Sequence, residues 1–303
     1  MVMKKKNPKI CILMATYNGE KYLEEQLNSL DRQKNVEIKI LVRDDGSTDL
    51  TKSILEKWSE KTFFKWYTGK HMNAAEGFID LVENAADADY YAFCDQDDVW
   101  DDDKLEIAVR SLCKEAAHIP QLYCSGSRLV DSNKNFISNH VLDVKRTQMA
   151  RLFFSGIAGN TMVFNRALKQ KICEYHPQNM KLHDTWVYKL CLCLGGKIII
   201  DPKPHLDYRQ HGSNVWGMET SFAKKIKKFT DIIKEKGTYQ ELMELYDNYY
   251  ESITPEYKEL LDTVKKCRGS VRSRLRLVCN PKIYFHNLGF DLAFRLKVLS
   301  NNL

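Results

Sequence analysis

The feature that most constrains the fold is a regular alternation of short apolar runs with stretches of helical spacing in the first third of the chain. Residues 9–16, 36–42 and 90–94 are strand-like apolar runs, and a further strand is expected near 63–67. Apolar residues at helical spacing separate these runs. Strands that alternate with helices pair in parallel through right-handed crossovers. The sequence therefore predicts a doubly wound α/β sheet.

The rest of the chain is less regular. We expect further elements in this order: a helix at about 102–117, strands at 122–129 and 161–164, a helix that opens at Asp184, a strand at 197–201 and a segment at 205–211. Beyond residue 217 helical spacing dominates. We therefore expect an α/β domain over residues 1–217 and a helical C-terminal extension over residues 218–303.

Polar residues stand directly after the predicted parallel strands. Because ligands bind beyond the carboxyl ends of such strands, we expect Thr16, Asp45 and Asp95 to share one crevice. The segment 16–19 (TYNG) offers a hydroxyl, a ring and backbone groups, and the Asp45 carboxylate can accept hydrogen bonds from a nucleobase or a ribose. The alternative for this part is a turn with a helix cap, which is the role that we expect for Asp49.

The sharpest chemical signal is the acidic cluster after the fourth strand, Asp95-Gln96-Asp97-Asp98. Two carboxylates that leave a strand end at i and i+2 can face the same crevice, where they repel each other unless a cation lies between them. A hard divalent cation that also binds phosphate oxygens is the natural complement. The alternatives are a solvated acidic turn, and the phosphorylated aspartate of a phosphatase, since Asp95 to Val99 also fits an Asp-x-Asp-x-Val pattern.

Three segments, taken together, resemble the inverting family-2 nucleotide-sugar glycosyltransferases with the GT-A fold. They are residues 15–19 (ATYNG), 44–49 (DDGSTD) and 95–100 (DQDDVW). The similarity runs from about Lys9 to Gly217. A closer similarity to the bacterial rhamnosyltransferase-like branch rests on 95–100, on HDTW at 183–186 and on YRQHGSNV at 208–215. The resemblance implies a mostly parallel, Rossmann-like sheet flanked by helices.

The resemblance also implies roles for single residues. Asp184 matches the catalytic base, and Asp97 with His211 matches the ligands of Mn²⁺ or Mg²⁺. Contacts to the nucleotide sugar are implied for Thr16, Tyr17, Asn18, Asp45, Asp95, Gln96 and Arg209. Contacts to the acceptor, or secondary roles, are implied for His183, Trp186 and Trp100. From the residues alone, other roles are open: Asp184 can be a helix N-cap, His183 a packing residue and Arg209 part of a surface salt bridge.

The implied activity is an inverting, metal-dependent sugar transfer. The branch suggests dTDP-L-rhamnose as donor, with UDP-hexoses as the alternative, and a growing lipid-linked surface polysaccharide as acceptor. A phosphatase with Asp95 as nucleophile and a non-catalytic binding module stay open as other hypotheses. We expect no nucleic-acid partner, because the chain lacks an aromatic and glycine RNA-binding signature.

The net charge of +6 is concentrated near the C-terminus. From Thr263 onward nine basic residues face a single acid, Asp291, and the apolar positions Phe285, Leu288, Leu292, Leu296 and Leu299 form one stripe. This combination suggests contact with an anionic membrane surface, and the alternative is a helix packed on the sheet with its basic side in water.

The cellular context is predicted from what the sequence contains. The apolar run near the N-terminus, Ile10 to Ala15, is too short for a signal peptide or a transmembrane helix, and the nine cysteines include no Cys-x-x-Cys pair. We expect a cytoplasmic protein with unpaired thiols, and the basic C-terminal region suggests a peripheral position on the inner face of the cell membrane.

Overall fold

Strands that are apolar on both faces must be covered by helices on both sides of the sheet. A computed structural model shows which helices cover them. The structure describes residues 7–70, 72–210 and 237–303. The strands are β1 (Lys9–Thr16), β2 (Glu37–Asp44), β3 (Phe64–Thr68), β4 (Tyr90–Cys94), β5 (Val99–Trp100), β6 (Gln121–Val130), β7 (Phe136–His140), β8 (Met162–Asn165) and β9 (Lys197–Arg209).

Helices connect the strands and fill the C-terminal region. They are α1 (Leu23–Asp31), α2 (Thr51–Trp58), α3 (Ala74–Asn84), α4 (Lys104–Leu112), α5 (Gln148–Arg151), η1 (Gly159–Thr161), α6 (Arg166–Ile172), α7 (His183–Cys193), α9 (Thr238–Tyr249), η2 (Tyr250–Ser252), α10 (Pro255–Cys267), α11 (Val271–Val278) and α12 (Leu288–Leu299). The expected helix at about 102–117 is shorter, because its last turn gives way to a loop after Leu112.

The strands form one sheet in the order β3-β2-β1-β4-β8-β6-β9-β5, with β7 on the edge of β6. The first four strands pair in parallel, as the alternation predicted. Thr16 lies opposite Asp44, and Met14 lies opposite Cys94, so the carboxyl ends of β1, β2 and β4 meet at one edge. Beyond β4 the sheet is mixed, because β8 runs antiparallel to both β4 and β6.

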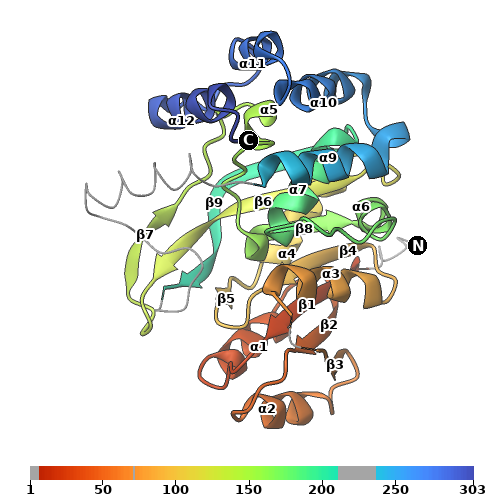
Figure 1. Ribbon diagram of the computed structural model, residues 1–303. Helices are drawn as coiled ribbons and strands as arrows, with labels where there is room; N and C mark the ends of the chain where they lie inside the picture. Colours follow the sequence, from red (N-terminus) through yellow and green to blue (C-terminus); the bar gives the residue numbers. More distant parts are fainter. Residues whose placement is uncertain (1–6, 71, 211–236) are drawn as a thin grey trace.

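Alternate side chains of the strands pack against two layers of helices (Figure 1). On β1, Cys11 and Leu13 face α3, α6 and α7, whereas Ile10 and Ile12 face α1, α2 and α4. Burial on both faces explains why the strand reads as a continuous apolar run.

The C-terminal helices share the core of the sheet. Leu242 and Leu245 of α9 and Leu261 of α10 belong to the same buried cluster as α3 and α7. Lys189 of α7 donates to Glu241 of α9 at 2.6 Å, and both side chains are buried. The predicted boundary between residues 217 and 218 falls within 211–236, outside the described residues.

Two expected elements differ from the structure. The helix at Asp184 was expected to be amphipathic, but α7 is buried from Trp186 through Cys193, because α9 and α10 cover its outer side and Glu241 neutralises Lys189. Residues 197–201 and 205–209 form one strand, β9, rather than two segments. The strand continues past Pro202 and Pro204 with an irregular register against β6 at that point.

Among the described residues, no helix combines the length and the apolar character that crossing a membrane requires.

Candidate active site

A network of hydrogen bonds begins at Thr16, at the edge where the carboxyl ends of the parallel strands meet. The Thr16 hydroxyl donates to the side-chain oxygen of Gln96 at 2.5 Å, and the Tyr17 backbone N–H donates to the same oxygen at 3.0 Å. The Gln96 amide in turn donates to the Tyr17 carbonyl at 3.2 Å. A Cβ on Gly19 would lie 2.3 Å from this Gln96 oxygen, so the close contact requires glycine. Gln96 thereby fixes the loop after β1, and the Tyr17 ring remains about half exposed at its rim.

Asn18 joins this loop to the loop after β2. Its backbone adopts a left-handed conformation with φ 47°, which asparagine tolerates better than most residues. Its side-chain oxygen accepts from the Thr48 N–H at 2.9 Å, and its own N–H donates to the Ser47 hydroxyl at 2.9 Å. Asp49 accepts from the Thr51 N–H at 3.0 Å and from the Glu20 N–H at 3.1 Å. The N-cap of α2 is Leu50, however, so Asp49 bonds the turn before the helix rather than occupying the expected cap position. The segments 15–19 and 44–49, both singled out from the sequence, therefore contact each other.

Asp45 is buried in an ion pair with Arg43, the side chain of which is also buried. Arg43 bonds in addition to Asp80 at 2.9 Å and to the Lys70 carbonyl at 2.7 Å. A Cβ on Gly77 would lie 3.2 Å from the guanidinium, so α3 approaches this pair closely. The carboxylate of Asp45 is thus fixed at the carboxyl-end edge of the sheet.

Asp95 and Asp97 follow β4 and are partly buried. Burial, and then the charges of Asp97 and Asp184, raise the pKa of Asp95 to about 7. Asp184 is therefore close enough for its charge to act on Asp95. Carboxylates that repel one another in a partly desolvated site are a fitting donor set for a hard divalent cation.

Asp184 lies in the first turn of α7. The Gly159 N–H donates to one of its carboxylate oxygens at 3.0 Å, and the Thr185 N–H donates to the other at 2.5 Å. Burial raises the pKa of Asp184 to about 6, and these hydrogen bonds moderate the rise. The group is therefore ionised at neutral pH, with a proton affinity higher than that of an exposed aspartate.

Asp98 joins the acidic loop to the segment that holds Asp184. It is fully buried, accepts from the Asn160 amide at 2.5 Å, and accepts weakly from the Arg209 N–H at 3.4 Å. Burial and the charges of Asp95 and Asp97 raise its pKa well above the usual range. Because Asn160 and Gly159 are neighbours in η1, one short turn touches both Asp98 and Asp184.

The three residues expected near the acceptor are core residues in this structure. His183 stacks on Phe78 at 3.9 Å and meets Phe93 edge-on at 4.7 Å, and burial lowers its pKa to about 3. Trp186 and Trp100 are fully buried as well. Their burial excludes direct acceptor contact in this conformation, so any effect that they have on transfer passes through packing.

Arg209, at the end of β9, is buried and engaged with the protein. Its guanidinium donates to the Asp97 carbonyl at 2.9 Å, to the Ser132 carbonyl at 2.9 Å and to Glu25 at 2.6 Å. It therefore fixes the backbone of Asp97, and its contact with phosphate stays a prediction. His211 lies outside the described residues.

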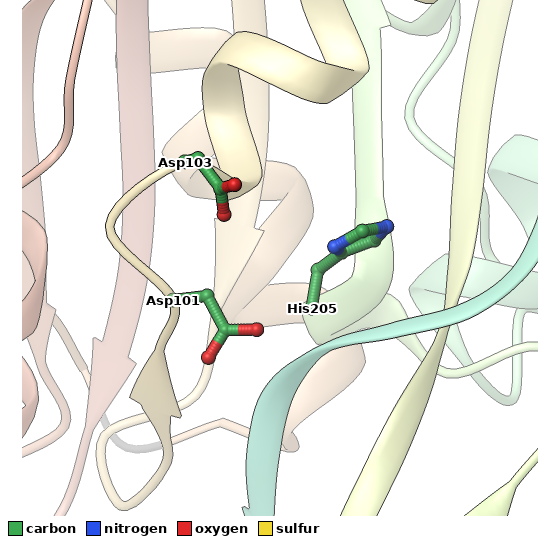
Figure 2. Close-up of side chains that lie close together, drawn as sticks. All are labelled: Asp101, Asp103 and His205. Carbon is green, nitrogen blue, oxygen red and sulfur yellow. The ribbon is translucent and has the colours of Figure 1, made fainter.

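A second group of possible metal ligands, Asp101, Asp103 and His205, gathers between the start of α4 and β9 (Figure 2). Arg128 donates to both carboxylate oxygens of Asp101, at 2.9 and 2.5 Å. The His205 ring lies 3.1 Å from the Asp201 carboxylate. Because these contacts already satisfy Asp101 and His205, we assign no metal to this cluster.

Sequence reasoning missed Arg43, Gly159, Asn160 and the structural role of Asp98. The role of Arg43 could have been predicted, since a cation at the end of a buried strand needs an adjacent anion. The roles of Gly159 and Asn160 could not, because their contacts depend on how a loop packs against α7.

Comparison with known proteins agrees with this geometry. The family model for glycosyl transferase family 2 matches residues 11–173. The chain is 30% identical to dTDP-rhamnosyl transferase RfbG of Shigella flexneri over 251 residues, which cover 77% of this chain and 83% of the relative. It is 28% identical to WfgD of Escherichia coli, a UDP-Glc:alpha-D-GlcNAc-diphosphoundecaprenol beta-1,3-glucosyltransferase, over 52% of this chain and 61% of the relative.

Solved structures share the fold. TarS of S. aureus in complex with UDP-GlcNAc superposes with a TM-score of 0.58 at 17% identity, covering 97% of this chain and 91% of that one. The mannosyltransferase PcManGT of Pyrobaculum calidifontis, in complex with GDP-Man and Mn²⁺, superposes with a TM-score of 0.53 at 14% identity, covering 98% and 89%. The predicted GT-A fold is confirmed.

The close packing of Gly159 generates a test of how Asp184 is positioned. A Cβ at residue 159 would lie 2.5 Å from the His183 ring and 3.5 Å from the Asp184 Cβ. We expect Gly159→Ala to displace Asp184 and to lower kcat by about tenfold or more while the nucleotide Kd changes little. Steady-state kinetics and nucleotide titration measure both values.

The matched control is Gly269→Ala, because a Cβ there meets no atom within 4 Å. This variant should keep wild-type kcat. A Gly159→Ala variant with unchanged kcat and Tm would show that the loop contact does not position the carboxylate.

Proposed function

Because the chain belongs to glycosyltransferase family 2, we propose that it transfers L-rhamnose from dTDP-L-rhamnose, with inversion at the anomeric carbon, to a hydroxyl of a lipid-linked oligosaccharide. The observation that carries this proposal is the position of Asp184, which two backbone N–H groups hold at the start of α7. The same short turn that bonds to Asp184 through Gly159 bonds through Asn160 to Asp98 of the acidic loop after β4. The family assignment replaces the phosphatase hypothesis for Asp95.

The proposed donor site uses the edge formed by β1, β2 and β4. Asp45 and Thr16 are suited to the base and ribose, because their carboxylate and hydroxyl oxygens are fixed by Arg43 and Gln96. The exposed Tyr17 ring and the Asn18 backbone border the same edge. Asp95 is suited to the ribose or to water bound to the metal.

A divalent cation, Mn²⁺ or Mg²⁺, would be held by Asp97, with Asp95 beside it and His211 as the further predicted ligand. When bound, such a cation neutralises charge on the leaving nucleoside diphosphate. Arg209 would act on this site indirectly, because it fixes the Asp97 carbonyl.

The proposed chemistry is a single displacement. Asp184 accepts the proton of the acceptor hydroxyl while the acceptor oxygen forms a bond to C1 of the sugar. The bond from C1 to the diphosphate oxygen breaks, and the nucleoside diphosphate leaves with the electron pair. Burial suits Asp184 to this role, because a pKa of about 6 leaves the group ionised at neutral pH yet able to take a proton as the hydroxyl reacts.

The donor and acceptor proposals rest on the relatives. The similarity to a dTDP-rhamnosyl transferase extends over most of both chains and supports dTDP-L-rhamnose. A UDP-hexose is the alternative, because WfgD uses UDP-Glc and TarS was solved with UDP-GlcNAc. WfgD also supports an undecaprenyl-diphosphate acceptor, and we propose that the enzyme acts as a peripheral protein at the cytoplasmic face of the membrane.

A panel of sugar nucleotides tests the donor proposal. With Mn²⁺ or Mg²⁺ present, nucleoside diphosphate release should be fastest with dTDP-L-rhamnose, and EDTA should abolish it. The same donor should raise Tm when metal is present, because a ligand that binds the native state stabilises it. Faster release from a UDP-hexose would select the alternative donor, and turnover that survives EDTA would contradict the metal site.

Replacement of the proposed base tests the mechanism. We expect Asp184→Asn to lower kcat by about three orders of magnitude or more, because asparagine cannot accept the proton, and to leave nucleotide affinity within about twofold. Product formation and calorimetric titration measure the two effects.

The matched control is Asp103→Asn, which removes an exposed carboxylate of the second acidic group. Its activity and metal dependence should equal those of the wild type. Wild-type turnover in Asp184→Asn would remove Asp184 from the mechanism.

A further inference from the structure

Helix α12 has the reverse of the usual distribution of side chains. Its lysine, Lys297, is 1% exposed, whereas Leu288 is 91% exposed and Leu292 is 52% exposed. Leu296 and Leu299 are also exposed. The inner face of the helix contains small or aromatic residues, Ala293 and Phe294, with Val298 beside them.

This distribution corrects the membership of the expected apolar stripe and favours the membrane interpretation over a helix packed with its leucines inward. Phe285 is buried against Phe154 and Phe294, so it belongs to the core rather than to the stripe. The four leucines stay outside. A helix packed on the sheet with its basic side in water would bury its leucines. Helix α12 instead exposes its leucines and buries Lys297, while Arg295 is exposed beside the leucines in the sequence. A row of exposed leucines on one helix marks a contact surface.

The neighbouring helix α11 adds exposed basic side chains. On the neighbouring helix α11, Arg272 and Arg276 are exposed beside Val271 and Leu275, which are 60% and 50% exposed. Figure 1 shows α10, α11 and α12 together at the end of the molecule farthest from α2. Two acids lie near this surface and are engaged within the fold: Asp291 accepts from the Phe285 N–H at 3.2 Å, and Glu259 of α10 pairs with Arg276 at 2.6 Å.

We propose that the outer leucines of α12, with Arg272 and Arg276 of α11, form a docking surface for an anionic lipid membrane. Leucines that enter the boundary between headgroups and acyl chains, with arginines at the phosphate level, match the pattern of an interfacial helix. A second copy of the chain fits less well, because a symmetric contact would bring two strongly basic surfaces together.

This inference extends the proposed function, since it names the surface that brings the site to a lipid-linked acceptor. It depends on the lipid-linked acceptor and not on the donor. Docking through α12 is a property of one end of the molecule, whereas sugar transfer depends on the edge of the sheet, so the two can be measured separately.

Co-sedimentation of the full chain with vesicles tests the proposal. Vesicles of phosphatidylglycerol and phosphatidylcholine should bind the protein, vesicles of phosphatidylcholine alone should bind it at least tenfold more weakly, and added salt should weaken binding. The variant Leu288→Ser/Leu292→Ser/Leu296→Ser should bind anionic vesicles at least tenfold more weakly. Its Tm and its release of nucleoside diphosphate with a water-soluble acceptor should match the wild type, because the replaced side chains are exposed.

The matched control is Leu50→Ser, which removes another exposed leucine far from α12 and should leave vesicle binding unchanged. Unaltered binding by the triple variant would overturn the proposal. A wild-type protein that is a dimer without lipid, together with a triple variant that is a monomer, would also overturn the proposal. That result would assign the surface to a second copy of the chain. Loss of vesicle binding with soluble transfer retained supports docking, whereas absence of transfer with every donor would refute the proposed function and leave the docking result standing.

Discussion

The structure depends on bringing four carboxyl groups, Asp95, Asp97, Asp98 and Asp184, to one partly buried edge of a sheet. Burial and mutual repulsion raise the pKa of Asp95, and burial raises that of Asp184. Such a site lowers the stability of the folded protein, because burial removes water from each carboxylate and the like charges repel one another. The same cost makes the site useful, since a divalent cation can relieve the repulsion and a buried carboxylate is a better base than an exposed one.

The surrounding fold supports that edge from several directions. Gln96 and Asn18 fix the loops after β1 and β2, and Arg209 fixes the backbone of Asp97. The turn η1 connects the two acidic parts, because Asn160 bonds to Asp98 while the Gly159 N–H bonds to Asp184. On the outer side, the pair of Lys189 and Glu241 joins α7 to α9, so the first helix of the C-terminal region is part of the framework that holds Asp184.

Much of this arrangement could be predicted from the sequence, for reasons that are specific to each part. The parallel strands were predicted because burial on both faces makes them continuously apolar, and their polar end residues follow from that placement. The burial of α7 was not predicted, because the residues that cover it are separated from it in the chain. The roles of Gly159 and Asn160 depend on loop packing, which leaves no periodic signal. On α12, the spacing of the leucines predicted a stripe, but only the structure shows that this stripe points outward.

The most direct test of the central claim, that Asp184 is a buried base, is the pH dependence of kcat/KM for the acceptor at saturating donor and metal. A carboxyl group with a raised pKa is protonated as pH falls through that value, and a protonated base cannot accept the hydroxyl proton. With a pKa of about 6 for Asp184, the account predicts that kcat/KM falls about tenfold for each pH unit below 6. A value that stays constant from pH 8 down to about 4.5 would contradict it.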